Sequence, residues 1–200
     1  MANIIKVMSQ MKRFFEKREI PYTSEEAVLW GMVSGDAAQW QWVIRLCDQG
    51  SGIVSLRAGC PVKVSAKRRA AAAEYLMRAN WDLNFGNFQM DWEDGEVSFR
   101  TSIPASASGV SIKAMTDLFY GPCMMMDHYL PGLLAVAVGN QDPAKAAAAA
   151  DIARCLQGQE GEVPDGNAEA EASAEVPNDM GDETAREKGT RLGRLFGGEN

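Results

Sequence analysis

The residues of this chain whose types suit chemistry are few, and the clearest candidates are its one histidine and its four cysteines. His128 follows Cys123 by five positions within a segment whose pattern is helical. A cysteine beside a histidine would supply a thiolate nucleophile and its general base. Five residues of helix turn through about 500°, so the two side chains point some 140° apart. We therefore expect no nucleophilic enzyme, and no Gly-x-Ser-x-Gly motif offers another nucleophile.

Four carboxylates gather at one point of the chain, around an Asp94-Gly95 pair. Asp91, Glu93, Asp94 and Glu96 could hold a metal only if their side chains converged. Neighbouring residues of a strand point to opposite faces, and the spacing does not fit a 12-residue calcium loop. We expect solvated charges and a turn aspartate. Since Cys-x-x-Cys pairs and phosphate-binding glycine motifs are also lacking, we expect no metal and no cofactor.

Four residues are candidates for binding a partner. Met124, Met125 and Met126 form a soft cluster that can line an adaptable apolar groove, although a place in a helix core is the alternative. Trp81 stands at the end of a predicted helix, where it can belong to a contact surface. The other tryptophans fall mostly on predicted strands and are expected in the core: Trp30, Trp40, Trp42 and Trp92. The basic run Lys67, Arg68 and Arg69 is expected to be solvated, with an anion or acidic-peptide contact as the alternative.

Charge divides the chain into two parts. The net charge is −7, yet residues 1–157 hold 16 Lys and Arg against 16 Asp and Glu, whereas residues 158–200 hold 4 against 11. The first part is neutral, so we expect no binding to nucleic acid or to an anionic membrane. No apolar run reaches the length of a membrane span, and the amino terminus lacks a signal-peptide pattern. We expect a cytoplasmic protein with its cysteines as thiols.

The pattern of apolar residues predicts an α+β fold. The order is α-βββ-α-ββ-α with an antiparallel five-stranded sheet, because helices and strands are segregated along the chain. The strand over 39–47 alternates cleanly, with Trp40, Trp42, Ile44 and Leu46 on one face, while 27–33 is apolar on both faces and is expected to be covered. Gly121-Pro122 should interrupt the last long helix and Pro131 should kink it. The predicted helices cover 3–19, 66–80 and 111–139, and the strands cover 27–33, 39–47, 52–58, 85–92 and 96–103. Residues 143–157 are rich in alanine and prone to form a helix, and they either extend the last helix or pack back on the sheet.

The composition changes sharply at about residue 158. Residues 1–157 are expected to form one α+β domain, and residues 158–200 a disordered acidic tail. The tail can act as a solubilising segment or shield an apolar groove of the domain. Its last apolar stretch, residues 191–196, is interpreted either as a short docking motif or as a random end.

Two phrases of the sequence resemble the YbjN-like family, whose fold is similar to that of type III secretion chaperones. Residues 83–100 read L-x-x-G-x-F-x-M-D-x-x-D-G-E-V-x-F-R, and residues 126–136 read M-D-H-Y-L-P-G-L-L-A-V. The resemblance spans about residues 3–156, with His128 where the family usually has Arg and Gly132 where Ala is common. It implies a regulatory or chaperone-like protein without an agreed enzymatic reaction. Chaperones of this fold are homodimers that hold an extended partner segment against the outside of the sheet and helices.

The sequence thus predicts a non-enzymatic cytoplasmic protein that binds a segment of a partner protein, as a homodimer. The alternative is a signalling regulator that senses a small ligand in a cleft between sheet and helices. A third class is an assembly factor whose acidic tail makes the contact.

Overall fold

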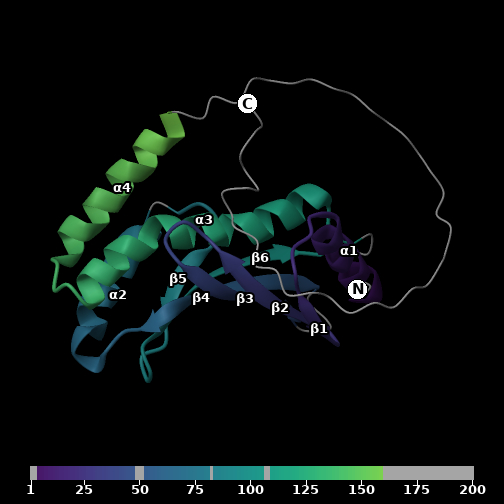
Figure 1. The fold of residues 1–200 in the computed structure, drawn as a ribbon, viewed down its shortest axis with the longest axis horizontal. Helices are drawn as coiled ribbons and strands as arrows, with labels where there is room; N and C mark the ends of the chain where they lie inside the picture. The colour runs from purple at the N-terminus through teal and green to yellow at the C-terminus, as the bar shows by residue number, and fades with distance from the viewer. Residues whose placement is uncertain (1–3, 48–51, 82, 106–108, 160–200) are drawn as a thin grey trace.

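The computed structural model describes residues 4–47, 52–81, 83–105 and 109–159. Its centre is an antiparallel sheet in which six strands follow the order β1-β2-β3-β4-β6-β5 (Figure 1). The strands are β1 (Thr23–Glu25), β2 (Val28–Ser34), β3 (Gln39–Cys47), β4 (Ile53–Lys63), β5 (Asn87–Met90) and β6 (Glu96–Pro104). The helices are α1 (Ile4–Lys17), α2 (Arg69–Trp81), which the short 3₁₀ helix η1 (Ala66–Arg68) precedes, α3 (Ile112–Ala137) and α4 (Pro143–Gln159). The predicted α+β class and antiparallel sheet are confirmed.

The prediction of five strands is wrong by one. The additional strand, β1, pairs with β2 at the sheet edge and places Thr23 opposite Trp30. Its three residues, Thr-Ser-Glu, are polar and too few to show an alternation of apolar and polar positions. The strand can be recognised only from its pairing with β2. The acidic tail from residue 160 on lies outside the described residues, so its predicted disorder stays a prediction.

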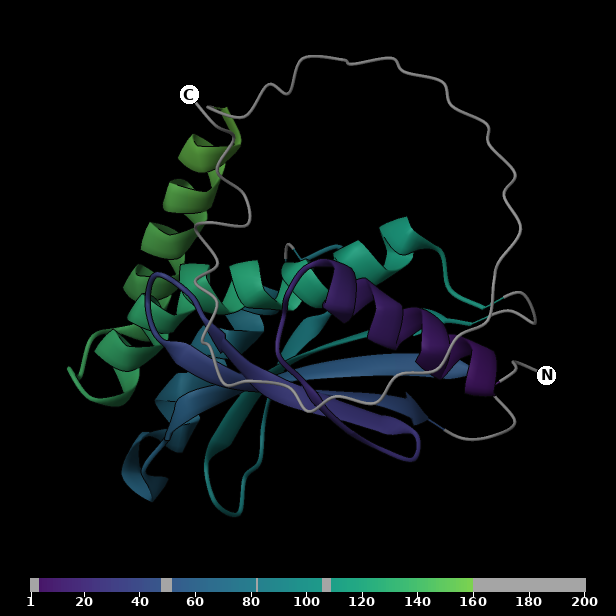
Figure 2. The same ribbon diagram turned by 45° about the vertical axis from the view of Figure 1, so that its right-hand side comes forward.

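One face of the sheet is buried under α1 and α3, which we call the inner face. It carries alternate residues of the strands, including Trp40, Trp42 and Ile44 of β3 and Val54, Leu56 and Ala58 of β4, all buried. The ring of Phe15 on α1 stacks on Trp42 with centroids 4.8 Å apart, and Phe119 on α3 meets Trp42 edge-on at 5.4 Å. These aromatic contacts tie both helices to the middle of β3. Helix α4 packs on α2 and α3 (Figure 2).

The predicted face of β3 is confirmed, but the prediction that the strand over 27–33 is covered on both faces is wrong. Strand β2 buries Leu29 and Val33 while Met32 is 51% exposed, so only its inner side is covered. Helix α2 buries Ala72, Tyr75, Leu76 and Ala79. A helix this rich in alanine has almost no contrast between its sides, so its tertiary contacts choose the buried face.

Helix α3 is continuous through both of its prolines, so the predicted interruption at Gly121-Pro122 is wrong. Pro122 has no N–H and leaves the carbonyl of Leu118, four residues earlier, without its helical donor. The buried hydroxyl of Thr101 on β6 lies 3.4 Å from this carbonyl oxygen and donates to it. The sheet thus replaces the hydrogen bond that the proline removes. The side of α3 that faces the sheet is buried along the length of the helix, so the helix continues past Pro122.

Gly132 explains one departure from the family pattern. A Cβ built at this position would overlap the hydroxyl oxygen of Tyr75. That hydroxyl donates to the carbonyl of Tyr129 at 2.8 Å and so joins α2 to α3. Glycine at this position leaves room for the tyrosine. Among the described helices, none has the combined length and apolarity that crossing a bilayer requires.

The bond between Thr101 and Leu118 makes a prediction about stability. Thr101→Val should lower the free energy of unfolding by about 1–2 kcal/mol, because the buried Leu118 carbonyl would lose its donor. In a Pro122→Ala background the same change should cost clearly less, since alanine restores the helical N–H. Urea unfolding of the four proteins in this double-mutant cycle measures the difference. Equal losses in both backgrounds would show that the proline and the threonine are not coupled.

Candidate functional site

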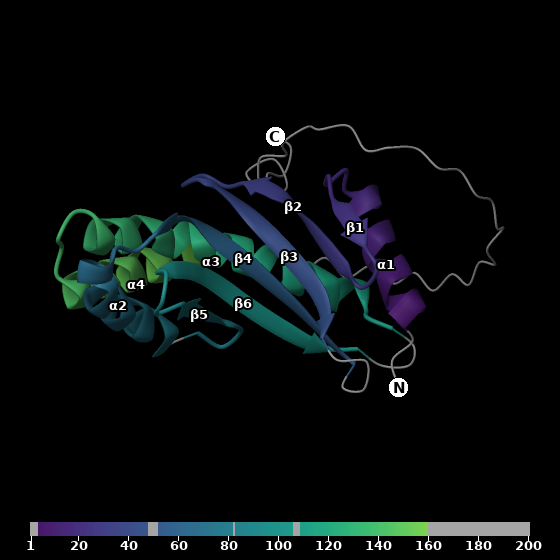
Figure 3. The same cartoon turned by 90° about the horizontal axis from the view of Figure 1, so that it is seen from below.

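The face of the sheet opposite α1 and α3, which we call the outer face, is open. In the described part of the chain no helix packs on it, and Figure 3 shows the strands from this side with α3 behind them. A groove of about 290 Å³ crosses it over β3, β4, β5 and β6. We call it the arginine groove; it is lined by Gln41, Val43, Arg45, Ser55, Arg57, Gly59, Gln89, Glu96 and Arg100. All but one of these residues are polar or glycine, which sets the groove apart from the apolar inner face.

Three arginines reach the groove from three adjacent strands. Arg45 lies on β3, Arg57 on β4 and Arg100 on β6, and Arg57 is the direct cross-strand partner of Arg100. Serines hold two of them: Arg57 Nε donates to Ser98 Oγ at 2.8 Å, and Arg100 Nε donates to Ser55 Oγ at 3.1 Å. These bonds fix the direction of both side chains and leave the outer guanidinium nitrogens to face the groove.

The groove carries an excess of positive charge. A residue of β6, Glu96, pairs with Arg57 at 3.2 Å, with both side chains more than 40% exposed. Among the residues that line the groove, three guanidinium groups thus accompany one carboxylate. The Cα atoms of Arg57 and Arg100 are opposite each other, but the bonds to Ser98 and Ser55 direct the two guanidinium groups in opposite directions along the strands. The lining residues carry a net charge of +2, three arginines against one glutamate, which favours an anionic ligand.

Apolar side chains lie beside the groove on the same face. Trp30 of β2 is the cross-strand partner of Val43, which itself lines the groove, and Met32 is the partner of Gln41. These three residues, Trp30, Met32 and Val43, form what we call the outer apolar strip; Met32 is 51% exposed, and Trp30 and Val43 are half-buried. The outer face thus offers arginines and apolar surface next to each other. The prediction that Trp30 lies in the core is wrong, because its strand is covered on one side only.

The four predicted partner-binding residues do not form one surface. Met124, Met125 and Met126 follow one another on α3, and successive helical residues point about 100° apart. Met124 is 50% exposed and Met126 is buried, while Met125 is partly buried against the core. Trp81 ends α2 and is 86% exposed. A role in binding stays a prediction for Trp81 and Met124, whereas Met126 belongs to the core.

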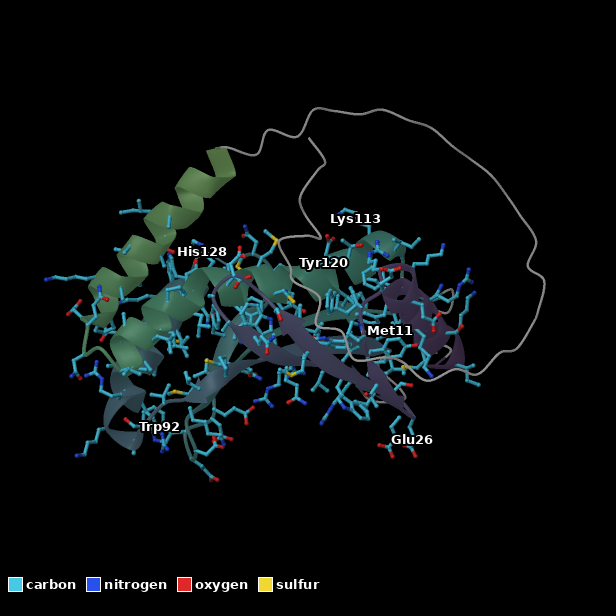
Figure 4. The ribbon with its side chains drawn as sticks, in the orientation of Figure 1. Met11, Glu26, Trp92, Lys113, Tyr120 and His128 are labelled. Carbon is cyan, nitrogen blue, oxygen red and sulfur yellow. The ribbon has the colours of Figure 1, made fainter. Side chains whose placement is uncertain are left out.

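Trp92 was also predicted in the core and is not found there. It sits in the turn between β5 and β6, is 61% exposed, and projects from that end of the sheet in Figure 4. Its backbone carbonyl accepts a hydrogen bond from Arg69 at 2.8 Å, and Arg68 donates to the carbonyl of Val136 at 2.6 Å. These two arginines of the basic run therefore join elements of the fold, and the expectation that they are merely solvated is wrong.

Cys123 and His128 lie on different sides of α3. His128 lies where α3 meets α4 (Figure 4), with its Nε2 atom 2.7 Å from the carbonyl of Ala150. Cys123 is fully buried on the other side of the helix, and burial raises the pKa of its thiol to about 12. Asp127 accepts a hydrogen bond from the amide of Ala37 at 2.8 Å and so fastens the β2–β3 turn to α3. Each of these groups is placed for structure.

The acidic cluster remains at its turn, as expected. Asp91 and Asp94 accept hydrogen bonds from the amides of Glu93 and Glu96, and Lys63 pairs with Asp94. Gly95 has φ +78°, and a Cβ there would strike the carbonyl oxygen of Val64, so only glycine suits the turn. Among the described residues no group of acidic, histidine or cysteine side chains is arranged to hold a metal ion.

Sequence reasoning missed the arginine groove, although part of its signal was present. The alternation of β3 predicts that Gln41 and Arg45 lie on the side that faces away from Trp40 and Trp42, and the structure confirms this. Arg57 and Arg100 also occupy outward positions of their strands. However, β4 and β6 are separated in the chain by α2 and β5, so their adjacency depends on the topology of the sheet.

Comparisons with known proteins include a likeness to a solved structure. No protein-family model matches the chain, and no curated protein matches it. The structure is similar to the crystal structure of YbjN from E. coli, for which a role as a transcription regulator has been suggested. The TM-score is 0.44 and the identity is 11%, over 60% of this chain and 85% of that one. This is the family that the sequence resembles; at such an identity the likeness concerns the fold.

The burial of Cys123 predicts its reactivity. In the folded protein iodoacetamide should alkylate Cys123 at least about a hundredfold more slowly than in urea, because the thiolate that reacts is scarce and covered. Peptide mass spectrometry after timed alkylation measures the rate at this site. Cys60, which is half-buried and has a pKa raised mainly by burial, should show a smaller protection. Alkylation of native Cys123 at the rate of a free cysteine would contradict the placement.

The excess of positive charge in the groove predicts a dependence on salt. Arg100→Gln removes one of its three guanidinium charges, and its effect on the free energy of unfolding should be most favourable at low ionic strength. The difference between variant and wild type should shrink by about 0.5 kcal/mol as sodium chloride screens the interactions among the charges of the groove. Urea unfolding at several salt concentrations measures it, with Arg13→Gln on α1 as the matched control. A difference that does not depend on salt would mean that the charges of the groove do not affect stability.

Proposed function

We propose that this chain is a non-enzymatic binding protein, of a regulatory or chaperone-like kind, that holds an acidic extended segment of a partner protein on the outer face of its sheet. The observation that carries the proposal is the position of Arg57 opposite Arg100, with Arg45 on the next strand and one carboxylate lining the same groove. The net positive charge of this groove attracts carboxylates.

The chemistry of the groove suits carboxylates held on a polypeptide. A guanidinium group binds a carboxylate through two parallel hydrogen bonds, and these are among the stronger hydrogen bonds in proteins. Neighbouring strands lie about 4.8 Å apart, so the three arginines span about 10 Å across the sheet. A segment that crosses the strands can meet them in turn. The outer apolar strip then takes the apolar side chains of the same segment.

A protein segment accounts for the site better than a small ligand does. Pockets for small molecules are mostly apolar and enclose most of the ligand. The arginine groove is open, the residues that line it are mostly polar, and its volume of about 290 Å³ lies at the lower limit for such pockets. The alternative, a regulator that senses a small anion, would use the same arginines without the apolar strip.

A protein partner is also favoured over nucleic acid. Residues 1–157 are neutral overall, and the three arginines share their groove with Glu96. Phosphate backbones are bound by many cations at once, and single strands also need aromatic side chains on which bases stack. The residues that line the groove include no aromatic ring. The absence of catalysis, the cytoplasmic location and the homodimer that the family implies belong to the same proposal.

Binding of an acidic probe tests the proposal. Fluorescein-labelled oligoglutamate should bind the full chain, and fluorescence anisotropy should show its affinity falling at least about tenfold in Arg57→Gln/Arg100→Gln, because each arginine contributes charge-assisted hydrogen bonds. The matched control is Arg13→Gln/Lys17→Gln, which removes two charges from exposed positions on α1 and should bind as the wild type does.

Three further probes separate the candidate functions. Oligoglutamine of the same length should not bind. A labelled DNA oligonucleotide that binds more tightly than oligoglutamate, through the same arginines, would replace the protein partner with nucleic acid. Free glutarate or phosphate that raises the melting temperature more than the peptide does would favour the small-ligand regulator. If the groove variant binds oligoglutamate as the wild type does, the outer face is not the site.

A further inference from the structure

We propose that the chain carries its own ligand for the arginine groove: residues 160–183, which follow α4, bind across the outer face and must be displaced by a partner. This inference deepens the proposed function and rests on it, since the same arginines would take both segments. The occupant is a named part of this chain, and the partner competes with it.

Charge complementarity singles out this segment. Residues 160–183 contain nine Asp and Glu and not one Lys or Arg. The four basic residues of the tail all come later, at Arg186, Lys188, Arg191 and Arg194. In residues 1–159 no stretch without a Lys or Arg holds more than five Asp and Glu, the number found between Arg78 and Arg100. A stretch with nine acidic residues and a groove of the opposite sign form a complementary pair within one polypeptide.

The acidic residues are spaced in a way that an extended segment can use. Between Glu160 and Glu175 they recur every two to four residues, separated by small or apolar side chains such as Val163, Ala168 and Ala170. In extended backbone, residues two apart project from the same side about 6.8 Å from each other. Carboxylates at these intervals can meet arginines on neighbouring strands. The intervening apolar residues suit the outer apolar strip.

The segment is long enough to reach the groove. The described chain ends with α4 at Gln159, on the helical side of the sheet. A folded unit of this size has a radius of gyration of about 15 Å, and so a diameter near 40 Å. Twenty-four extended residues span up to about 80 Å. Residues 160–183 can therefore pass the edge of the sheet and still lie across β3, β4 and β6.

Tethering gives even a weak contact a large effect. A segment joined to its own binding site by a short linker is present there at an effective concentration in the millimolar range. A partner segment at micromolar concentration then has to compete with it. The expected consequence is that the full chain binds an acidic peptide on the order of tenfold more weakly than a chain whose tail is neutral.

The experiment uses the full-length chain with its tail charges removed. The tail-neutral variant combines Glu160→Gln, Glu162→Gln, Asp165→Asn, Glu169→Gln, Glu171→Gln, Glu175→Gln, Asp179→Asn, Asp182→Asn and Glu183→Gln. Oligoglutamate should bind this variant on the order of tenfold more tightly than it binds the wild type. The gain should disappear when Arg57→Gln/Arg100→Gln is added, because the tail and the peptide use the same arginines.

A second measurement detects the contact directly. In nuclear magnetic resonance spectra, the Nε–Hε signals of Arg57 and Arg100 should differ between the wild type and the tail-neutral variant, and the difference should fade as sodium chloride is added. The signal of Arg78, which pairs with Glu74 on α2, serves as the internal control and should not move. The difference should not depend on protein concentration, because the contact is within one chain.

The outcomes separate the inference from the proposed function. If oligoglutamate binds wild type and tail-neutral variant equally, through the arginines in both, the inference is overturned and the proposed function stands. If oligoglutamate binds neither the wild type nor the tail-neutral variant, both the inference and the proposed function are overturned. A shift of the arginine signals that grows with protein concentration would assign the tail to a second copy of the chain and overturn the intramolecular contact.

Discussion

The structure depends on the burial of one face of an antiparallel sheet under two helices. Trp42 of β3 lies at the centre of this interface, in contact with Phe15 of α1 and Phe119 of α3. Side chains of a strand alternate between its two faces, so the residues that fill the core at every second position leave the others to the outside. The covered face therefore determines the composition of the open one. The core of the domain and its candidate binding surface are two sides of the same strands.

Helix α3 needs polar contacts as well as apolar burial, because its sequence contains residues that disturb a helix. Thr101 supplies the hydrogen bond that Pro122 cannot make, and Tyr75 fits over Gly132 to reach the carbonyl of Tyr129. Asp127 fastens the turn between β2 and β3 to the same helix. These contacts come from β6, α2 and a turn, so they join distant parts of the chain to a single helix. The phrase of the sequence that resembles the YbjN-like family includes several of these positions.

The outer face has a different physical character, because it concentrates positive charge. Arg45, Arg57 and Arg100 lie on three adjacent strands and share their groove with one carboxylate, Glu96. Serines orient the side chains of Arg57 and Arg100, so little conformational freedom remains to be lost when an anion binds. A surface that is positively charged and ordered before binding is suited to recognition of an anion, and the acidic residues that follow α4 have the matching charge.

The amino-acid sequence alone was enough to predict the class of the fold, the period of its strands and the absence of any familiar catalytic motif. It did so because alternation, glycine turns and helical spacing are local properties, visible in Trp40, Trp42 and Ile44 or in Asp94-Gly95. It placed Met124, Met125 and Met126 in one group because they are adjacent in the chain, whereas helical geometry turns them to different sides. Tertiary structure alone decided that β4 lies beside β6, and so brought Arg57 to Arg100 across 43 positions of sequence. It also decided that α3 continues through Pro122, because the donor that permits this comes from another strand. Contacts between distant segments have no local signature, and the candidate site is made of such contacts.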